Sequence, residues 1–312
     1  MTQVAADRVI KIAVVGDVHD QWEVEDGEAL CHLGVDLVLF VGDLGNESID
    51  VVRAIAALDL PKAVILGNHD AWYTATDWGR KKCPYDRTQN DRFQQQLELL
   101  GDTHVGYSYL DFLELGVSVV GARPFSWGGS EWKHTEFYQK RYGVSSFAES
   151  TARIVHAAEQ AAHNRLILLG HCGPFGLGDR PEDPCGKDWQ PLGGDHGDPD
   201  MAAAIAAIRQ RGKTIPLVAF GHMHHTLRHT KQYLRTPIAT DAETLYLNAA
   251  SVPRIVHTPT RQRNFSLVYL YQGQVQQASL VWLGEGYAIA SERILYDSST
   301  PQPEMAAAQR IA

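Results

Sequence analysis

The sequence has few cysteines and no long apolar segment. Its four cysteines, at positions 31, 83, 172 and 185, include no CxxC pair, so we expect free thiols rather than a disulfide framework or a zinc ribbon. No apolar run approaches the roughly 18 residues that a membrane-spanning helix needs. The start, MTQVAADRVIK, also lacks the basic-then-apolar pattern of a secretion signal. These absences argue against a membrane protein and favour a cytoplasmic location.

Positive charge is also scarce. The chain has 28 Lys and Arg against 37 Asp and Glu, a formal net charge of −9. Such a balance repels a polyanion such as duplex DNA unless a local basic patch overrides it, so general nucleic-acid binding is not expected. Hydrophobic residues are 44% and charged residues 21%, as in ordinary globular proteins, so a folded core is expected. The sequence leaves the oligomeric state open.

Short apolar runs alternate with helical segments through much of the chain. Runs rich in Val, Ile and Leu are typical of strands buried on both faces, and they lie at 9–15, 35–41, 62–66, 165–170 and 214–220. Helices are predicted at 48–60, 92–100 and 146–164. This alternation implies βαβ units and a mostly parallel sheet. Antiparallel strands are predicted at 244–250, 265–271 and 274–283.

The chain shows no linker between two separate cores, so we expect one domain over residues 1–296. Residues 173–200 are dense in Gly, Pro and Asp and show no periodicity. Because a long irregular stretch inside a domain is usually functional or disordered, we interpret this one as an active-site loop. Residues 297–312 are predicted to form a disordered tail.

Five short polar motifs come directly after predicted strands. They are Gly16-Asp17-Val18-His19, Gly42-Asp43, Gly67-Asn68-His69-Asp70, Gly170-His171 and Gly221-His222-Met223-His224. A lone Asp after a glycine is usually a turn former or helix cap, and a lone His is usually structural. Five such motifs, each after a predicted strand, are not explained in this way. Loops at the carboxyl ends of strands share one crevice in an open α/β sheet, so we expect the five motifs to converge on one site. Imidazole with carboxylate suits Mn, Fe, Co, Ni or Zn, and the preceding glycines permit close approach of the backbone.

The order of these motifs, DxH, GDxx, GNHD, GH and GHxH over residues 16–224, resembles the calcineurin-like metallophosphoesterase superfamily. The resemblance implies a four-layer αββα sandwich of two mixed sheets flanked by helices, with a dinuclear metal site. By position it implies a first metal bound by Asp17, His19 and His224, a bridging Asp43, and a second metal bound by Asn68, His171 and His222. It also implies that His69 faces the leaving group.

Other details narrow the resemblance. The protein Ser/Thr phosphatase branch shows GDxVDRG and GNHE, whereas this chain has GDLGN at 42–46 and GNHD at 67–70. The chain is therefore more similar to the bacterial phosphodiesterase and small-molecule phosphoesterase branches. The segments GDVHDQW, GARPFS and NAASVPR resemble those of a cyanobacterial and plastid group of this superfamily.

These features predict a metal-dependent phosphoesterase acting on a small phosphodiester or phosphomonoester. Two divalent ions about 3.5–4 Å apart can share a water, lower its pKa and clamp the reacting oxygens, so a bridging hydroxide would attack phosphorus. We expect two ions drawn from Mn, Fe, Zn, Co and Ni, with Mn preferred in vitro. His69 would stabilise the phosphoryl charge or protonate the leaving alkoxide, and Asp70 would orient it or cap a helix. Arg123 and Arg254 are predicted to bind a phosphate oxygen, the alternative being surface positions.

Two other functions remain open. A metal-dependent nuclease acting on single-stranded nucleic acid would use the same chemistry but needs a basic groove. A non-catalytic scaffold that retained a metal would be expected to lack His69 or a ligand, and none is missing. The aromatic residues Trp72, Tyr73 and Trp78 could stack a nucleobase or simply be buried against the segment that follows the GNHD motif.

Overall fold

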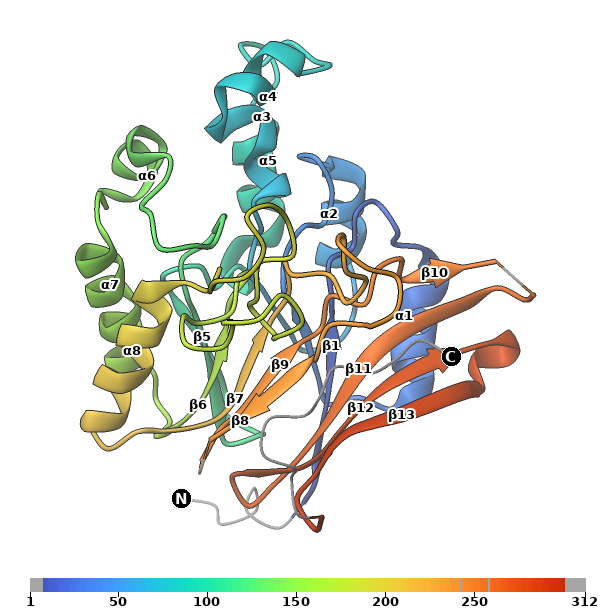
Figure 1. The fold of residues 1–312 in the computed structure, drawn as a ribbon. Helices are drawn as coiled ribbons and strands as arrows, with labels where there is room; N and C mark the ends of the chain where they lie inside the picture. Colours follow the sequence, from blue (N-terminus) through green and yellow to red (C-terminus); the bar gives the residue numbers. More distant parts are fainter. Residues whose placement is uncertain (1–7, 242, 258, 301–312) are drawn as a thin grey trace.

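Figure 1 shows a sandwich of two sheets with helices on its outer faces, in a computed structural model that describes residues 8–241, 243–257 and 259–300. The strands are β1 (Ile10–Val15), β2 (Leu37–Phe40), β3 (Lys62–Val64), β4 (Tyr109–Phe112), β5 (Val117–Gly121), β6 (Arg165–Leu169), β7 (Thr214–Phe220), β8 (Ile238–Thr240), β9 (Leu245–Asn248), β10 (Ile255–Val256), β11 (Gln262–Tyr271), β12 (Gln274–Leu283) and β13 (Ile289–Asp297). The α-helices are α1 (Val24–Leu33), α2 (Ile49–Ala56), α3 (Trp72–Ala75), α4 (Asp77–Lys82), α5 (Arg92–Leu100), α6 (Thr135–Tyr142), α7 (Phe147–Gln160) and α8 (Pro199–Gln210). Short 3-10 helices are η2 (His69–Ala71), η3 (Gly101–Thr103) and η4 (Glu285–Tyr287).

Both sheets have a parallel centre and antiparallel edges. Within the described ranges, the first sheet has seven strands in the order β13-β12-β11-β1-β2-β3, with β10 paired to β11. The second has six strands in the order β4-β5-β6-β7-β9-β8. Strands β1, β2 and β3 run parallel, as do β5, β6, β7 and β9, so their carboxyl ends lie along common edges. This is the predicted αββα architecture of two mixed sheets.

Strand β1 explains why the predicted strands are apolar on both faces. Its Ile12 and Val14 pack between the two sheets, whereas Ala13 and Val15 belong to the core under α1 and α2. Successive side chains of a strand point to opposite faces, so a strand covered on both sides needs apolar residues at every position. A third core lies between the second sheet and helices α7 and α8, which cover its outer face in Figure 1.

Most predicted elements are present, and several keep their predicted bounds. Helix α5 and strands β7 and β12 match the expected ranges, while β2, β3 and α2 are shorter than predicted. Helix α1 fills the helix-like stretch expected between the first two strands, whereas helices α3, α4 and α6 and strand β13 were not predicted, because they are short or lack a clear apolar face. Strand β13 reaches the first residue of the predicted tail, and residues 301–312 of that tail lie outside the described residues.

No helix in the described part of the chain is long and apolar enough to cross a bilayer. All four cysteines are free, in agreement with the predicted absence of a disulfide framework. Two of them, Cys172 and Cys185, are buried, and burial raises the pKa of each thiol. Both are therefore held as neutral thiols inside the fold.

The two arginines predicted to bind substrate are buried structural residues. Arg123, which is 2% exposed, donates from Nε to Asp200 at 3.0 Å and from Nη2 to Asp198 at 2.6 Å. Arg254 is fully buried and donates from Nη2 to Asp26 at 3.2 Å. Acceptors of the protein itself thus bind each guanidinium: two carboxylates for Arg123, and Asp26 with the backbone carbonyls of Gln21 and Asn264 for Arg254. We correct the prediction that these side chains bind a phosphate oxygen: Arg123 instead joins the end of β5 to the start of α8.

The first prediction concerns the Arg123 cluster. Replacing Arg123 with Met is expected to lower the free energy of unfolding by about 3–5 kcal/mol, because two buried carboxylates lose their cation. Burial already raises the pKa of Asp198, so this carboxylate is costly to keep charged without Arg123. Urea denaturation measures the change, with the exposed Arg153→Ala variant on α7 as control. A stable Arg123→Met protein with weakened phosphate binding would restore the substrate role.

Candidate metal centre

The five polar motifs lie at the carboxyl ends of five parallel strands, and their side chains converge. The segment after β1 carries Asp17 and His19, and the loop after β2 carries Asp43. The remaining positions follow β3 (Asn68 and His69), β6 (His171) and β7 (His222 and His224). Both sheets therefore contribute to one site, as the strand-end argument predicts.

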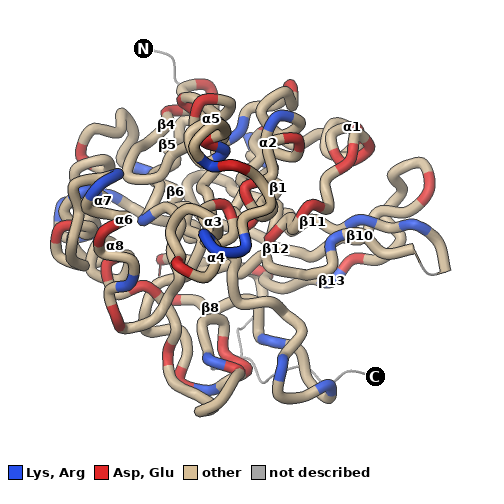
Figure 2. The backbone as a smooth tube through the Cα atoms, turned by 90° about the horizontal axis from the view of Figure 1, so that it is seen from above, with Lys and Arg blue, Asp and Glu red and all other residues tan. Residues whose placement is uncertain are grey.

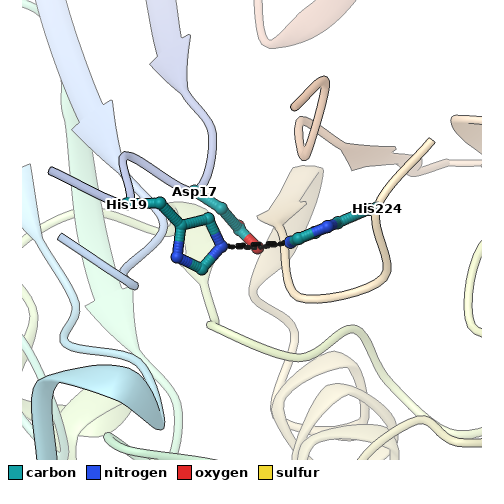
Figure 3. A group of neighbouring side chains, drawn as sticks. All are labelled: Asp17, His19 and His224. Carbon is teal, nitrogen blue, oxygen red and sulfur yellow. Dashed lines mark hydrogen bonds and ion pairs between the residues drawn. The ribbon is translucent and has the colours of Figure 1, made fainter. Parts of the chain in front are cut away.

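The first group consists of Asp17, His19 and His224, whose ligand atoms lie close together (Figure 3). The Nε2 atoms of His19 and His224 are 3.1 Å apart. The Oδ2 atom of Asp17 lies 3.3 Å from His224 Nε2 and 3.9 Å from His19 Nε2. Asp17 is completely buried, while both histidines are half-buried.

The second group consists of Asp43, His171 and His222, with Asn68 beside it. The Oδ1 atom of Asn68 lies 2.9 Å from His171 Nε2 and 3.0 Å from His222 Nδ1. The two histidine nitrogens are 3.2 Å apart. These nitrogen and oxygen atoms thus lie as close to one another as the ligands of one small cation do, and no thiolate is among them.

Asp43 connects the two groups. Its Oδ2 atom lies 3.9 Å from His19 Nε2, and its Oδ1 atom lies 3.3 Å from His171 Nε2. Asp43 is 2% exposed and has a positive φ of 50°, an uncommon backbone conformation for a residue other than glycine. The two oxygens of one carboxylate therefore face different groups, which is the arrangement that a bridging ligand requires.

The protonation pattern of His171 tests whether a cation fits. Its Nδ1–H donates to the Val41 carbonyl at 2.8 Å, so in the neutral ring Nε2 carries a lone pair. That bare nitrogen faces oxygens of Asn68 and Asp43, at 2.9 Å and 3.3 Å. Lone pairs that meet in a buried place repel one another, and a cation between them would turn this repulsion into coordination. The residues therefore fit a divalent metal, and the backbone carbonyl holds the His171 ring in the tautomer that a metal needs.

The buried charges shift several pKa values. Burial favours the protonated form of Asp17, but the hydrogen bond with His224 and the charge of that ring outweigh it and lower the pKa of Asp17. Burial lowers the pKa of His222. Asp17 is consequently an anion and His222 a neutral ring, the forms in which these side chains bind metals.

Glycines allow the backbone to approach the carboxylates. A Cβ added to Gly221 would lie 2.1 Å from Asp17 Oδ1, and one added to Gly67 would lie 2.4 Å from Asp43 Oδ1. Any larger residue at either position would displace a carboxylate. The predicted role of glycine in these motifs is therefore confirmed for Gly67 and Gly221.

Asp70 does not orient His69. Its Oδ1 accepts the backbone N–H groups of Leu44 (2.9 Å) and Gly45 (3.3 Å), and its Oδ2 accepts that of Gly67 (2.7 Å). Asp70 therefore ties the loop after β2 to the loop after β3, and neither the orienting role nor the helix cap is observed. Burial and the negative charge of Asp43 raise its pKa.

Asn46, which the sequence analysis did not single out, is the partner of His69. The Nδ1 atom of His69 lies 2.7 Å from Asn46 Oδ1, so Nδ1–H donates and Nε2 is left for other contacts. Asn46 is the third residue after Asp43, and its place within the GDLGN motif was the available sequence signal. On its other side, the His69 ring stacks on Trp72 at 5.0 Å.

The irregular segment 173–200 packs against the site. The His196 ring is nearly parallel to that of His222, with 5.9 Å between centroids. Its Nε2–H donates to the Trp127 carbonyl at 3.1 Å, and burial lowers its pKa to about 4. His196 lies within the segment interpreted from the sequence as an active-site loop, but no periodicity placed it near a particular motif.

The chain was compared with known families and structures. The sequence model of the calcineurin-like phosphoesterase family matches residues 10–226. No curated protein matches the chain. One solved structure is similar with a TM-score of 0.52 and 12% identity, covering 86% of this chain and 98% of that one, and it indicates the same fold.

Two further solved structures are similar to this chain. The TT1561 protein of Thermus thermophilus has a TM-score of 0.48 and 14% identity, covering 85% of this chain and 100% of that one. A dimetal phosphatase from Danio rerio has a TM-score of 0.47 and 13% identity, covering 94% of this chain and 100% of that one. The comparisons do not show the expected resemblance to a cyanobacterial and plastid group.

The second prediction separates the roles of Asp70 and Asn46. In metal-free protein, Asp70→Ala is expected to lower the free energy of unfolding by about 2–4 kcal/mol, because three backbone N–H groups lose their acceptor. Asn46 is exposed, so Asn46→Ala should change it by less than about 0.5 kcal/mol. Urea denaturation of both variants measures the difference. Equal losses of stability in the two variants would contradict this division of roles.

Proposed function

Because the chain belongs to the calcineurin-like phosphoesterase family and is thus a metal-dependent phosphoric ester hydrolase, we propose that it cleaves a small phosphodiester or phosphomonoester at a dinuclear centre. The observation that carries this proposal is the position of Asp43, whose two oxygens face separate groups of ligand atoms. One carboxylate shared in this way supports a pair of ions rather than one.

The ligand set follows from the two groups. The first ion would be held by Asp17, His19 and His224, the second by Asn68, His171 and His222, and both by Asp43. We propose Mn, Fe, Zn, Co or Ni as the metals, with Mn the first choice for reconstitution, since nitrogen and oxygen donors are mixed. The neutral Asn68 amide adds coordination without adding negative charge that would repel a phosphate.

The bound ions would make a water nucleophilic near neutral pH and offset the charge that builds on the phosphoryl oxygens. His69 lies at the edge of the first group, its ring 5.0 Å from that of His19. With Nδ1 held by Asn46, its Nε2 is free to face the leaving group, where it would donate a hydrogen bond or a proton to the departing oxygen. Asn46 therefore acts as the positioning residue for this step.

The neighbourhood of the site favours a small substrate. The rings of Trp72 and His196 contact His69 and His222, so the two flanks of the centre are walled by side chains. Arg235 holds segment 173–200 in place by donating from Nη1 to the carbonyls of Asp183 at 2.7 Å and Gly186 at 2.8 Å. Such a walled site suits recognition of a compact group beside the phosphate.

The third prediction tests the centre itself. Protein stripped by a chelator is expected to hydrolyse neither bis(4-nitrophenyl) phosphate nor 4-nitrophenyl phosphate, and Mn²⁺ should restore turnover of at least one. Asp43→Ala should lose about 100-fold or more in kcat together with bound Mn²⁺, since both ions lose a ligand. His69→Ala should lose about 10²- to 10⁴-fold in kcat and keep its Mn²⁺. Elemental analysis of each variant separates the two effects.

Controls make this result specific. Asn46→Ala is expected to lower kcat about tenfold with Mn²⁺ content unchanged, because the His69 ring loses its acceptor. His156→Ala, an exposed histidine on α7, should behave as wild type. The proposed centre is wrong if Asp43→Ala and His69→Ala turn over substrate at the wild-type rate.

A further inference from the structure

A cavity separate from the metal centre lies between the segment that carries α3 and α4 and the helix α6. Its volume is about 540 Å³. Its lining includes His134, the acidic residues Asp77 and Glu136, and four basic side chains, which are Arg80, Arg87, Lys140 and Arg141. We call this cavity the basic cleft. It is large enough for a phosphate group with part of an attached molecule.

The basic cleft stands out against an acidic protein. The chain has a net charge of −9, yet residues 72–92 contain five Lys or Arg against three Asp or Glu. Residues 133–141 contain three basic residues against one acidic residue. Figure 2 shows basic positions on the segment at α4. A local excess of positive charge in an acidic chain attracts an anion to this place in particular.

Two of the four basic side chains have no hydrogen-bond or ion-pair partner in the described part of the chain. Arg80 is paired with Asp77, and Arg141 lies 3.6 Å from Asp91. Arg87 and Lys140 make no such contact with any described residue, and Lys140 is exposed. The charge of Arg87 also acts on Glu47, but the N–H groups of Arg87 and the ammonium group of Lys140 are available to a ligand in the cleft.

A row of aromatic rings joins the cleft to the metal centre. The His69 ring stacks on Trp72 at 5.0 Å, Trp72 lies 5.2 Å from Trp127, and Trp127 lies 4.8 Å from His134, which lines the cleft. Both tryptophans are partly exposed, and Trp78, 59% exposed, meets the edge of Trp72. Partly exposed indole rings that lead to a basic cleft are suited to a nucleobase and its phosphates.

Trp127 carries a further sign of an unfilled contact. Its Nε1 atom is buried and has no hydrogen-bond partner among the described residues. A buried donor without an acceptor costs free energy, so such a group commonly meets a ligand or an ordered water. Because Nε1 is buried in this structure, it can meet a ligand oxygen only after neighbouring side chains move.

We propose that the basic cleft binds a second phosphate of the substrate, so that the substrate class is a nucleotide with a scissile phosphoester at one end and another phosphate across the nucleoside. The scissile group lies at the metal centre, the sugar extends toward the cleft with its base against the tryptophans, and Arg87 and Lys140 bind the second phosphate. This inference rests on the proposed phosphoesterase function and specifies the substrate of the same site.

Three chromogenic esters of increasing size test the proposal with Mn²⁺-loaded protein. They are bis(4-nitrophenyl) phosphate, the 4-nitrophenyl ester of thymidine 5′-phosphate, and the same ester carrying a 3′-phosphate. Wild type should have the highest kcat/KM for the third. The double variant Arg87→Glu/Lys140→Glu should lose about tenfold or more on the third ester and change less than about twofold on the first. The conservative variant Arg87→Lys/Lys140→Arg should keep the preference.

A matched charge control excludes a general field effect. Lys81 and Lys82 lie on α4 but do not line the cleft, so Lys81→Glu/Lys82→Glu makes the same change in net charge nearby. This control should preserve the preference for the 3′-phosphate. Equal losses in the two double variants, or a wild type indifferent to the 3′-phosphate, would overturn the proposal while hydrolysis of bis(4-nitrophenyl) phosphate still supported the phosphoesterase.

Binding provides a readout that does not depend on turnover. Calorimetry should show that wild type binds thymidine 3′,5′-bisphosphate about tenfold or more tightly than thymidine 5′-phosphate, and that Arg87→Glu/Lys140→Glu abolishes this difference. Equal affinities in wild type would refute the second phosphate site. Single-stranded oligothymidylate is the last substrate to compare. If its kcat/KM exceeded that of the small bisphosphate ester, the cleft would bind a nucleic-acid strand and the small-substrate proposal would be overturned.

Discussion

The crowding of lone pairs at the carboxyl ends of the strands is the constraint on which the rest of the structure depends. His171 uses its only N–H on a backbone carbonyl and turns a bare nitrogen toward oxygens of Asn68 and Asp43. Buried acceptors that face one another are stable only when something positive lies between them. The positive φ angles of Asp43 and His222 are consistent with this reading, since uncommon backbone conformations concentrate at sites that the surrounding structure holds in place.

The strands supply the rigidity that such an arrangement needs. The five segments that carry the site follow strands buried on both faces, so each ligand projects from a fixed edge of a sheet. Asp70 then joins two of the loops through backbone N–H groups, and Arg235 does the same for segment 173–200 through backbone carbonyls. Charged side chains thus hold the irregular backbone around the centre in place through hydrogen bonds to backbone groups. Segment 173–200 is a packed wall of the site in this structure, with His196 against His222.

Charge is distributed unevenly over the molecule, and this matters for the substrate. The overall charge of −9 argued against binding of long nucleic acids. Segments 72–92 and 133–141 are local exceptions, because each has an excess of basic residues and both line the basic cleft. The aromatic row between Trp72 and His134 connects that cavity to the metal centre. With the proposed anion site in the cleft, this arrangement would suit a substrate with several distinct chemical groups better than a simple phosphate ester.

The sequence by itself determined most of the strands and the positions of the polar motifs, because hydrophobic periodicity and the residues at strand ends are local properties of the chain. The αββα architecture followed from the resemblance of the motif order to the calcineurin-like superfamily. Only the tertiary structure decided which polar groups pair. Arg123 meets Asp198 across 75 residues and is therefore structural, although its type and position suited a phosphate ligand equally well. Asn46 rather than the adjacent Asp70 faces His69 for the same reason. The partner of a side chain depends on how distant segments pack, and spacing along the chain carries no information on that.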